Sequence, residues 1–143
     1  MRIADILRSK GSTVATVTET TTVTGLLAEL ATGNIGAMVV IGSEGVVGIV
    51  SERDVVRTLH EHGPDLLRRS VADIMSSSVV TCGLEDRVDD LAALMTNNRV
   101  RHVPVLDSGR LVGIVSIGDV VKNRMEELQD ERQQLQAYIT QGG

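Results

Sequence analysis

The sequence predicts an α+β fold made of two pseudo-symmetric copies of one unit, followed by a terminal helix. Ten residues at 47–56 recur at 112–121 with an offset of 65, and eight of the ten positions are identical. A repeat at a fixed offset indicates two equivalent structural units in one chain. Both copies also show the same order of apolar patterns, β-α-β-β-α. Strands joined by a short turn are antiparallel, and helices on one face of such a sheet give the α+β class.

Each unit is expected to open with a short helical turn, because residues 3–7 match residues 71–75. A β segment is predicted next, at 14–17 in the first unit and at 79–82 in the second. A helix follows in each unit, because apolar residues recur at i, i+3, i+4 and i+7. These residues are Val23, Leu26, Leu27 and Leu30 in the first unit, and Val88, Leu91, Leu94 and Met95 in the second.

Two buried strands with a Gly/Ser turn between them complete the predicted sheet of each unit. The first of these strands is expected at 37–41 and again at 102–106, and the second at 46–50 and again at 111–115. Pro104 has no N–H to donate to a strand ladder. It therefore predicts an edge or strand-start position.

A closing helix is expected to begin near Arg53 in the first unit and near Gly118 in the second, where it continues to about residue 139. In this last helix, one stripe keeps a spacing of three and four residues over nearly three heptads. The stripe contains Val121, Met125, Leu128, Leu135 and Ile139, with Arg132 at its remaining position. Two interpretations stay open, an amphipathic helix packed on its own domain and a seam between two chains.

These patterns divide the chain into a first repeat at 1–62, a linker at 63–70, a second repeat at 71–125, and an amphipathic helix and tail at 126–143. The dipeptide Gly63-Pro64 is the turn signal within the linker. One repeat of about 60 residues would be marginally stable alone. We therefore expect the two repeats to pack together.

Composition excludes several classes of protein. The net charge of −5 opposes binding to nucleic acid, and the lone aromatic residue, Tyr138, leaves no platform for stacking bases. No apolar run reaches the roughly 18 residues of a membrane helix, and residues 1–5 lack the pattern of a signal peptide. We therefore expect a cytoplasmic protein with no membrane partner. The single Cys82 provides neither a disulfide nor a CxxC zinc pair.

The repeated motif Gly-x-x-Ser-x-x-Asp lies where a strand ends and a helix begins. Its serines, Ser51 and Ser116, would face a site that favours anions, because helix N-termini carry partial positive charge. Its aspartates, Asp54 and Asp119, could accept hydrogen bonds from the vicinal hydroxyls of a ribose. Helix capping is the simpler role for both residue types. Capping does not explain why the whole Gly-Ile-Val-Ser run recurs, so we interpret the motif as part of a nucleotide site.

Enzymatic interpretations are weaker. A triad of Ser51, His102 and Asp54 lacks the Gly-x-Ser-x-Gly turn that exposes a nucleophile. His60 and His62 are two residues apart, a spacing that separates their side chains around a helix, so we expect no metal site. No catalytic residues are predicted.

Together with the run Arg101-His102-Val103-Pro104-Val105, the two repeats resemble the CBS domain family in its tandem form, the Bateman module, as found in free-standing bacterial proteins. The resemblance covers residues 1 to about 125. It implies two clefts related by a pseudo-twofold axis, each able to hold an adenosine ligand such as AMP, ADP, ATP, NAD or S-adenosylmethionine. It implies no catalytic cofactor.

In this family the Ser/Asp motif of one repeat works with the early β segment and the strand start of the other. By that resemblance, one cleft would contain Ser51, Arg53, Asp54, Thr81, Arg101, His102 and Pro104, and the other would contain Ser116, Asp119, Thr16, Ile35, Gly36 and Ala37. Arg101 and His102 offer charge or donors to phosphates, whereas the aligned Gly36 and Ala37 offer none. We therefore expect phosphate-rich ligands in the first cleft.

The function predicted from the sequence is a non-catalytic sensor of an adenosine nucleotide. A ligand that bridges both repeats would couple their relative orientation to its own concentration. The expected assembly is a homodimer that reports to an unidentified protein partner. Two alternatives remain, a ligand-independent dimerisation or interaction module and a small hydrolase of ATP or NAD.

Overall fold

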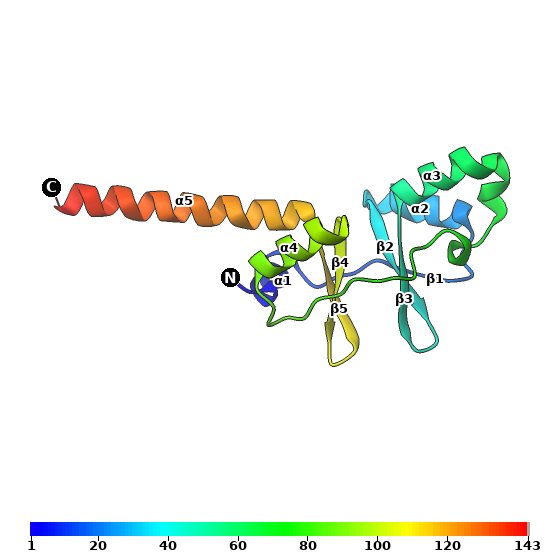
Figure 1. Cartoon of the computed structure of the whole chain (residues 1–143), viewed down its shortest axis with the longest axis horizontal. Coiled ribbons are helices and arrows are strands. Elements are labelled where there is room, and N and C mark those ends of the chain that lie inside the picture. The colour runs from blue at the N-terminus through cyan, green and yellow to red at the C-terminus, as the bar shows by residue number, and fades with distance from the viewer. Residues whose placement is uncertain (143) are drawn as a thin grey trace.

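The computed structural model describes residues 1–142 and confirms the predicted α+β class, with two β-hairpins side by side, helices packed beside each, and one long projecting helix (Figure 1). In chain order the elements are α1 (Ile3–Lys10), β1 (Thr16–Thr18), α2 (Val23–Gly33), β2 (Ala37–Gly42), β3 (Gly45–Ser51), α3 (Glu52–His62), the 3₁₀ helices η1 (Gly63–Arg68) and η2 (Val71–Asp73), α4 (Val88–Asn98), β4 (His102–Asp107), β5 (Arg110–Ser116) and α5 (Ile117–Gly142).

The two sheets differ in their number of strands. In the first repeat β1 pairs parallel with β2, and β2 pairs antiparallel with β3, whereas the second repeat contains only the antiparallel pair β4 and β5. The strand predicted at 79–82 is therefore wrong. Only Cys82 bridges Val105 there, through hydrogen bonds from the Cys82 N–H to the Pro104 carbonyl (3.1 Å) and from the Leu106 N–H to the Cys82 carbonyl (2.8 Å).

Pro104 lies on an edge strand, as predicted. Its strand β4 pairs with β5 on one side, and on the other side it meets only the single bridge at Cys82. The Pro104 carbonyl faces that bridge, so no ladder hydrogen bond is lost where the proline has no N–H.

The apolar stripes predicted for the two central helices are confirmed. Val23, Leu26 and Leu30 are buried on α2, and the equivalent face of α4 is buried on the second sheet. Each helix ends at a residue in the left-handed conformation, Asn34 with φ 49° and Arg99 with φ 55°. This termination turns the chain directly into β2 and β4, whose first residues border the site described below.

The segment expected to be a linker is ordered. Residues 63–68 form η1, and the side chain of Leu66 is fully buried in the core of the first repeat. Gly63, with φ +72°, caps the C-terminus of α3, and Pro64 lies in the first turn of η1. The turn signal at these two residues is therefore real, but it marks a helix-to-helix turn.

Each repeat completes its core with the leading segment of the other repeat. Ile3, Ile6 and Leu7 of α1 belong to the core formed by α4, β4 and β5. Val71 and Ile74 belong to the core formed by α2, β2 and β3. Figure 1 shows α1 beside α4 and β5, far from the rest of the first repeat. Neither repeat has a complete core without the other.

The glycine of the repeated motif permits this exchange. A Cβ atom on Gly48 would lie 2.6 Å from the Met75 sulfur and 2.9 Å from the Ser76 carbonyl oxygen. A Cβ atom on the equivalent Gly113 would lie 2.7 Å from the δ carbons of Leu7. The recurring Gly-Ile-Val-Ser run is thus explained by close packing of the exchanged segments as well as by any ligand.

The structure contradicts the interpretation in which the apolar stripe of α5 packs on its own domain. Its first turns are anchored, because Val120 and Asn123 are each only 7% exposed. The stripe itself is not packed on its own domain, since its apolar side chains are 49–68% exposed and the helix projects beyond α1 and α4 (Figure 1). Among residues 1–142, no helix combines the length and apolar character needed to span a membrane.

We predict that Gly48→Ala lowers the free energy of unfolding by about 1–3 kcal/mol, because the added methyl group meets a backbone carbonyl that cannot move freely. Urea denaturation followed by circular dichroism measures this change. Gly118→Ala is the matched control, because its Cβ would lie 3.5 Å from its nearest neighbour on a helix. Equal stabilities of the two variants would contradict the packing role of Gly48.

Candidate functional site

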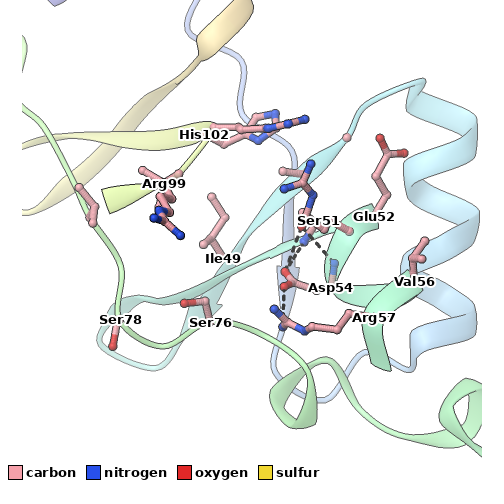
Figure 2. A pocket seen from close by; sticks show the side chains of 16 residues that line it. Ile49, Ser51, Glu52, Asp54, Val56, Arg57, Ser76, Ser78, Arg99 and His102 are labelled. Atoms are coloured by element: carbon pink, nitrogen blue, oxygen red, sulfur yellow. Dashed lines mark hydrogen bonds and ion pairs between the residues drawn. The ribbon is translucent and has the colours of Figure 1, made fainter. Parts of the chain in front are cut away.

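A cavity of about 740 Å³ lies between the two repeats (Figure 2). Its lining comes from the end of β3 and the start of α3, from the segment before Cys82, and from the turn between α4 and β4. The lining residues are Gly36, Ala37, Ile49, Ser51, Glu52, Arg53, Asp54, Val56, Arg57, Ser76, Ser78, Val80, Arg99, Val100, Arg101 and His102. Both repeats therefore contribute to one site.

Ser51 and Asp54 form a capping box at the N-terminus of α3. The Ser51 hydroxyl accepts a hydrogen bond from the Asp54 N–H (3.3 Å), and the Asp54 carboxylate accepts one from the Ser51 N–H (2.8 Å). The capping role considered from the sequence is thus present. The same contacts fix both side chains at the cavity wall, where the Asp54 carboxylate is 15% exposed.

Arginines dominate the charge of the cavity. Arg53 and Arg57 come from α3, and Arg99 and Arg101 come from the turn before β4, against the two carboxylates of Glu52 and Asp54. One of these carboxylates is already paired, because Arg57 donates to Asp54 at 3.0 Å. Four guanidinium groups in one cleft of a chain with net charge −5 favour a ligand with several negative charges.

His102 lies at the start of β4, opposite Asp54 and Arg57 in the view of Figure 2. Burial lowers the pKa of His102, and the nearby positive charges of Lys10 and Arg101 lower it further against the opposing effect of Asp119 and Glu52. The ring is therefore neutral at neutral pH, so that it can offer one donor and one acceptor to a ligand.

The cavity gathers most of the residues that were expected in the first cleft. Ser51, Arg53, Asp54, Arg101 and His102 line it, and Thr81 and Pro104 do not. Val80 lines the cavity in place of Thr81, because neighbouring residues of an extended segment point to opposite sides. Thr81 instead borders a smaller hollow beside Cys82 and Asp86.

The residues expected in the second cleft lie at different places in the structure. Gly36 and Ala37 line the same cavity as Asp54, because the strand starts of the two repeats lie close to each other. Thr16 lies exposed on β1, and Ile35 packs half-buried against the core of the first repeat. Ser116 ends β5 and Asp119 lies in the first turn of α5, both outside this cavity. They repeat the capping contacts of Ser51 and Asp54, at 3.2 and 2.8 Å.

A lysine from α1 occupies the equivalent position beside Asp119. The Lys10 ammonium donates to the Asp119 carboxylate at 2.5 Å and to the Ile114 carbonyl at 2.7 Å. Burial raises the pKa of Asp119, but the hydrogen bonds from Lys10 and Ser116 outweigh it and hold the pKa below its usual value. The offset that aligns residues 3–7 with 71–75 places Lys10 opposite Ser78, which lines the cavity of the first motif.

Several lining residues were missed at the level of sequence. Arg57 follows Asp54 by three residues on α3, a spacing that places both side chains on one face of the helix. Arg99 belongs to the same turn as Arg101, and its left-handed conformation is not visible in a sequence pattern. The first of these could have been found from helical periodicity.

The described residues offer little support for a metal site or for a reactive cysteine. Within residues 1–142, no group of three or more His, Cys, Asp or Glu side chains could hold a metal ion. Burial, with a smaller contribution from the charge of Asp86, raises the pKa of Cys82 to about 12, so this thiol is not a nucleophile at neutral pH.

Known proteins with the same organisation are readily found. The model of the CBS domain family matches residues 3–61 and 71–126. The CBS domain-containing protein CBSX3, mitochondrial, of Arabidopsis thaliana is 36% identical over 99% of this chain and 72% of its own length.

Solved structures agree with this assignment. The CBS-domain containing protein ATU1752 from Agrobacterium tumefaciens is 41% identical, with a TM-score of 0.84 over 87% of this chain and 99% of its own. The CBS domain pair of protein MJ0100, in complex with 5′-methylthioadenosine and S-adenosyl-L-methionine, is 25% identical, with a TM-score of 0.75 over 85% of this chain and 98% of its own. The chain therefore belongs to the CBS domain family, of which it carries two tandem copies.

Proposed function

We propose that this CBS pair is a non-catalytic regulatory module that binds an adenosine nucleotide between its two domains and transmits the ligand state by a conformational change. The observation that carries this proposal is the shared cavity, in which the Ser51/Asp54 motif of one domain faces the Arg99 and Arg101 turn of the other. A volume of about 740 Å³ lies within the range of roughly 300–1,000 Å³ typical of small-molecule sites.

Different lining residues of the cavity suit the phosphates, the ribose and the purine of a nucleotide. The four arginines supply charge-assisted donors for phosphate oxygens. The Asp54 carboxylate, held at the cavity wall, can accept from ribose hydroxyls. Ile49, Val56 and Val80 offer aliphatic surface for a purine. The complex of protein MJ0100 with two adenosine compounds supports adenosine as the ligand class.

A ligand in this position would bias the arrangement of the domains. Its ribose contacts would come from α3 of the first domain, and its phosphate contacts would come largely from the turn before β4 of the second. A ligand that binds one relative orientation better than another shifts the population toward it. The cavity thus supports sensing, because one ligand would contact both domains at once.

The second cleft, beside Ser116 and Asp119, is not expected to bind a nucleotide. The Lys10 ammonium already holds the Asp119 carboxylate that would otherwise meet a ribose. A nucleotide at this position would have to displace a partly buried ion pair whose side chains are 30% and 22% exposed. We therefore expect one nucleotide per chain, bound in the Asp54 cavity.

A homodimer, an unidentified regulated partner and a cytoplasmic location belong to the same proposal. The exposed apolar side chains of α5 favour a dimer. The competing function, an interaction module that needs no ligand, is favoured by these same side chains. Nucleotide binding separates the two functions.

We predict that AMP, ATP, NADH or S-adenosylmethionine gives saturable binding in calorimetric titration, and that Asp54→Ala weakens it by roughly tenfold to a hundredfold, the cost of hydrogen bonds to a charged group. Asp119→Ala is the matched control, because it removes the same capping box from the other motif and should leave the affinity unchanged.

Absence of binding by any of these compounds to folded protein free of carried-over nucleotide would move the assignment to the interaction module. Turnover of ATP or NAD on prolonged incubation would instead indicate a hydrolase.

We further predict that Arg99→Ala weakens ATP binding about tenfold and changes adenosine binding little, because we expect this cavity-lining guanidinium to contact the phosphates. Titrations at two salt concentrations should give a smaller salt dependence for the variant. Arg110→Ala removes the same charge at the turn between β4 and β5 and should match the wild type. Equal losses for ATP and adenosine would place the phosphates elsewhere.

Finally, Lys10→Ser places beside the second motif the same residue type that Ser78 provides beside the first motif. We predict that the calorimetric stoichiometry rises from one nucleotide per chain toward two, because the Asp119 carboxylate becomes free to meet a ligand. Arg8→Ser, on the same helix, removes an equal charge from an exposed side chain and should retain a stoichiometry of one. Two nucleotides per wild-type chain would show that Lys10 does not close the second cleft.

A further inference from the structure

The outer part of α5 has no support from the rest of its own chain. Every side chain from Leu128 to Gln141 is exposed, along about four turns of helix. A helix of this length is only marginally stable in water, even when its sequence is rich in alanine. Beyond its continuity with the anchored first turns, this part of α5 would gain stability from a surface that covers it.

The exposed apolar residues of α5 lie along a single line. The α5 stripe consists of Val121, Met125, Leu128, Arg132, Leu135 and Ile139. Its members are separated alternately by four and three residues, the repeat that forms the seam of a two-stranded coiled coil. The five apolar members are 49–68% exposed. Residues that anchor the helix to the body, Val120 and Asn123, lie on a different face.

We propose that α5 pairs with α5 of a second copy of this chain in an antiparallel coiled coil, so that the two α5 stripes cover each other. The homodimer is shared with the proposed function, but no step of this inference depends on a nucleotide. What it adds is the surface, the direction of pairing and the register.

The order of residues in the α5 stripe makes it complementary to its own reverse. If the two helices cross at Asp130 in opposite directions, Val121 meets Ile139 of the second copy and Met125 meets Leu135 of the second copy. Each of these contacts occurs twice because of the twofold symmetry. All apolar members except Leu128 then face an apolar residue. A shift by one heptad would leave apolar residues unpaired at both ends.

Arg132 decides the direction of pairing. In a parallel pair in register, the two Arg132 guanidinium groups would meet in the same layer of the seam, where like charges repel. In the antiparallel pair each Arg132 instead faces Leu128 of the second copy, and the two arginines are one helical turn apart. The stem of Arg132 can cover that leucine while its charge reaches outward.

In this arrangement Arg132 lies near carboxylates of the second copy. Residues 126–131 contain four carboxylates and no cation, and they surround the crossing point at Asp130. Each Arg132 is thus placed against the acidic segment of the other copy. A partner of different sequence would have to supply both the acidic segment and the matching apolar spacing, which a second copy supplies by itself.

The first test measures the mass of the nucleotide-free protein by sedimentation equilibrium. We expect a dimer for the wild type and a dissociation constant raised roughly tenfold or more by Leu135→Lys, because the lysine places charge in the seam. Gln134→Lys adds the same charge on the opposite face and should dimerise like the wild type. A monomeric wild type, or a Leu135→Lys variant that dimerises unchanged, would overturn the proposal.

The second test fixes the direction by disulfide formation. Met125→Cys and Leu135→Cys are prepared separately, with the buried Cys82 left in place. In the antiparallel register the mixture of the two variants forms a cross-linked dimer and neither variant does so alone, because identical positions are about 15 Å apart along the helix. Cross-linking of either variant by itself would show parallel pairing and overturn the proposed direction. Circular dichroism of each variant shows whether the body is folded.

Discussion

The reciprocal exchange of leading segments is the constraint on which the rest of the structure depends. Ile3 and Leu7 at the N-terminus fill the core of the second domain, and Val71 and Ile74 fill the core of the first. Burying one such side chain contributes about 1.5–3 kcal/mol, so neither domain can discard the exchanged segment and remain stable. The two repeats therefore fold as one unit, although the sequence presents them as two.

This exchange also produces the site. It holds the two domains face to face, so that the start of α3 meets the turn before β4 across one cavity. Local backbone contacts then orient the side chains, the capping box for Asp54 and the left-handed turn for Arg99. These contacts exist without a ligand. A nucleotide would find its groups largely pre-positioned, which lowers the entropic cost of binding.

The sequence could predict what depends on periodicity. The repeat, the helical stripes and every strand except the one expected at 79–82 could be predicted because each follows from spacing along one chain, and the motif led to Ser51 and Asp54. Contacts between segments that are far apart in the sequence could not be predicted. An alignment of the repeats does not say that α1 packs on the second domain, and it did not distinguish Thr81 from Val80, which differ only in the side of the chain they face.

The two copies differ in the residue that lies beside their Ser/Asp motif. Beside the first motif, Ser78 lines the cavity. Beside the second motif, Lys10 donates hydrogen bonds that join the end of α1 to β5 and to the first turn of α5. These hydrogen bonds connect the base of the projecting helix to the segment that completes the second core. Under the proposed function, a change in the angle between the domains, driven from the Asp54 cavity, would move α5 together with the second domain. The Lys10–Asp119 ion pair keeps the base of α5 fixed to the second domain, and its pairing allows a charged lysine in a partly buried position.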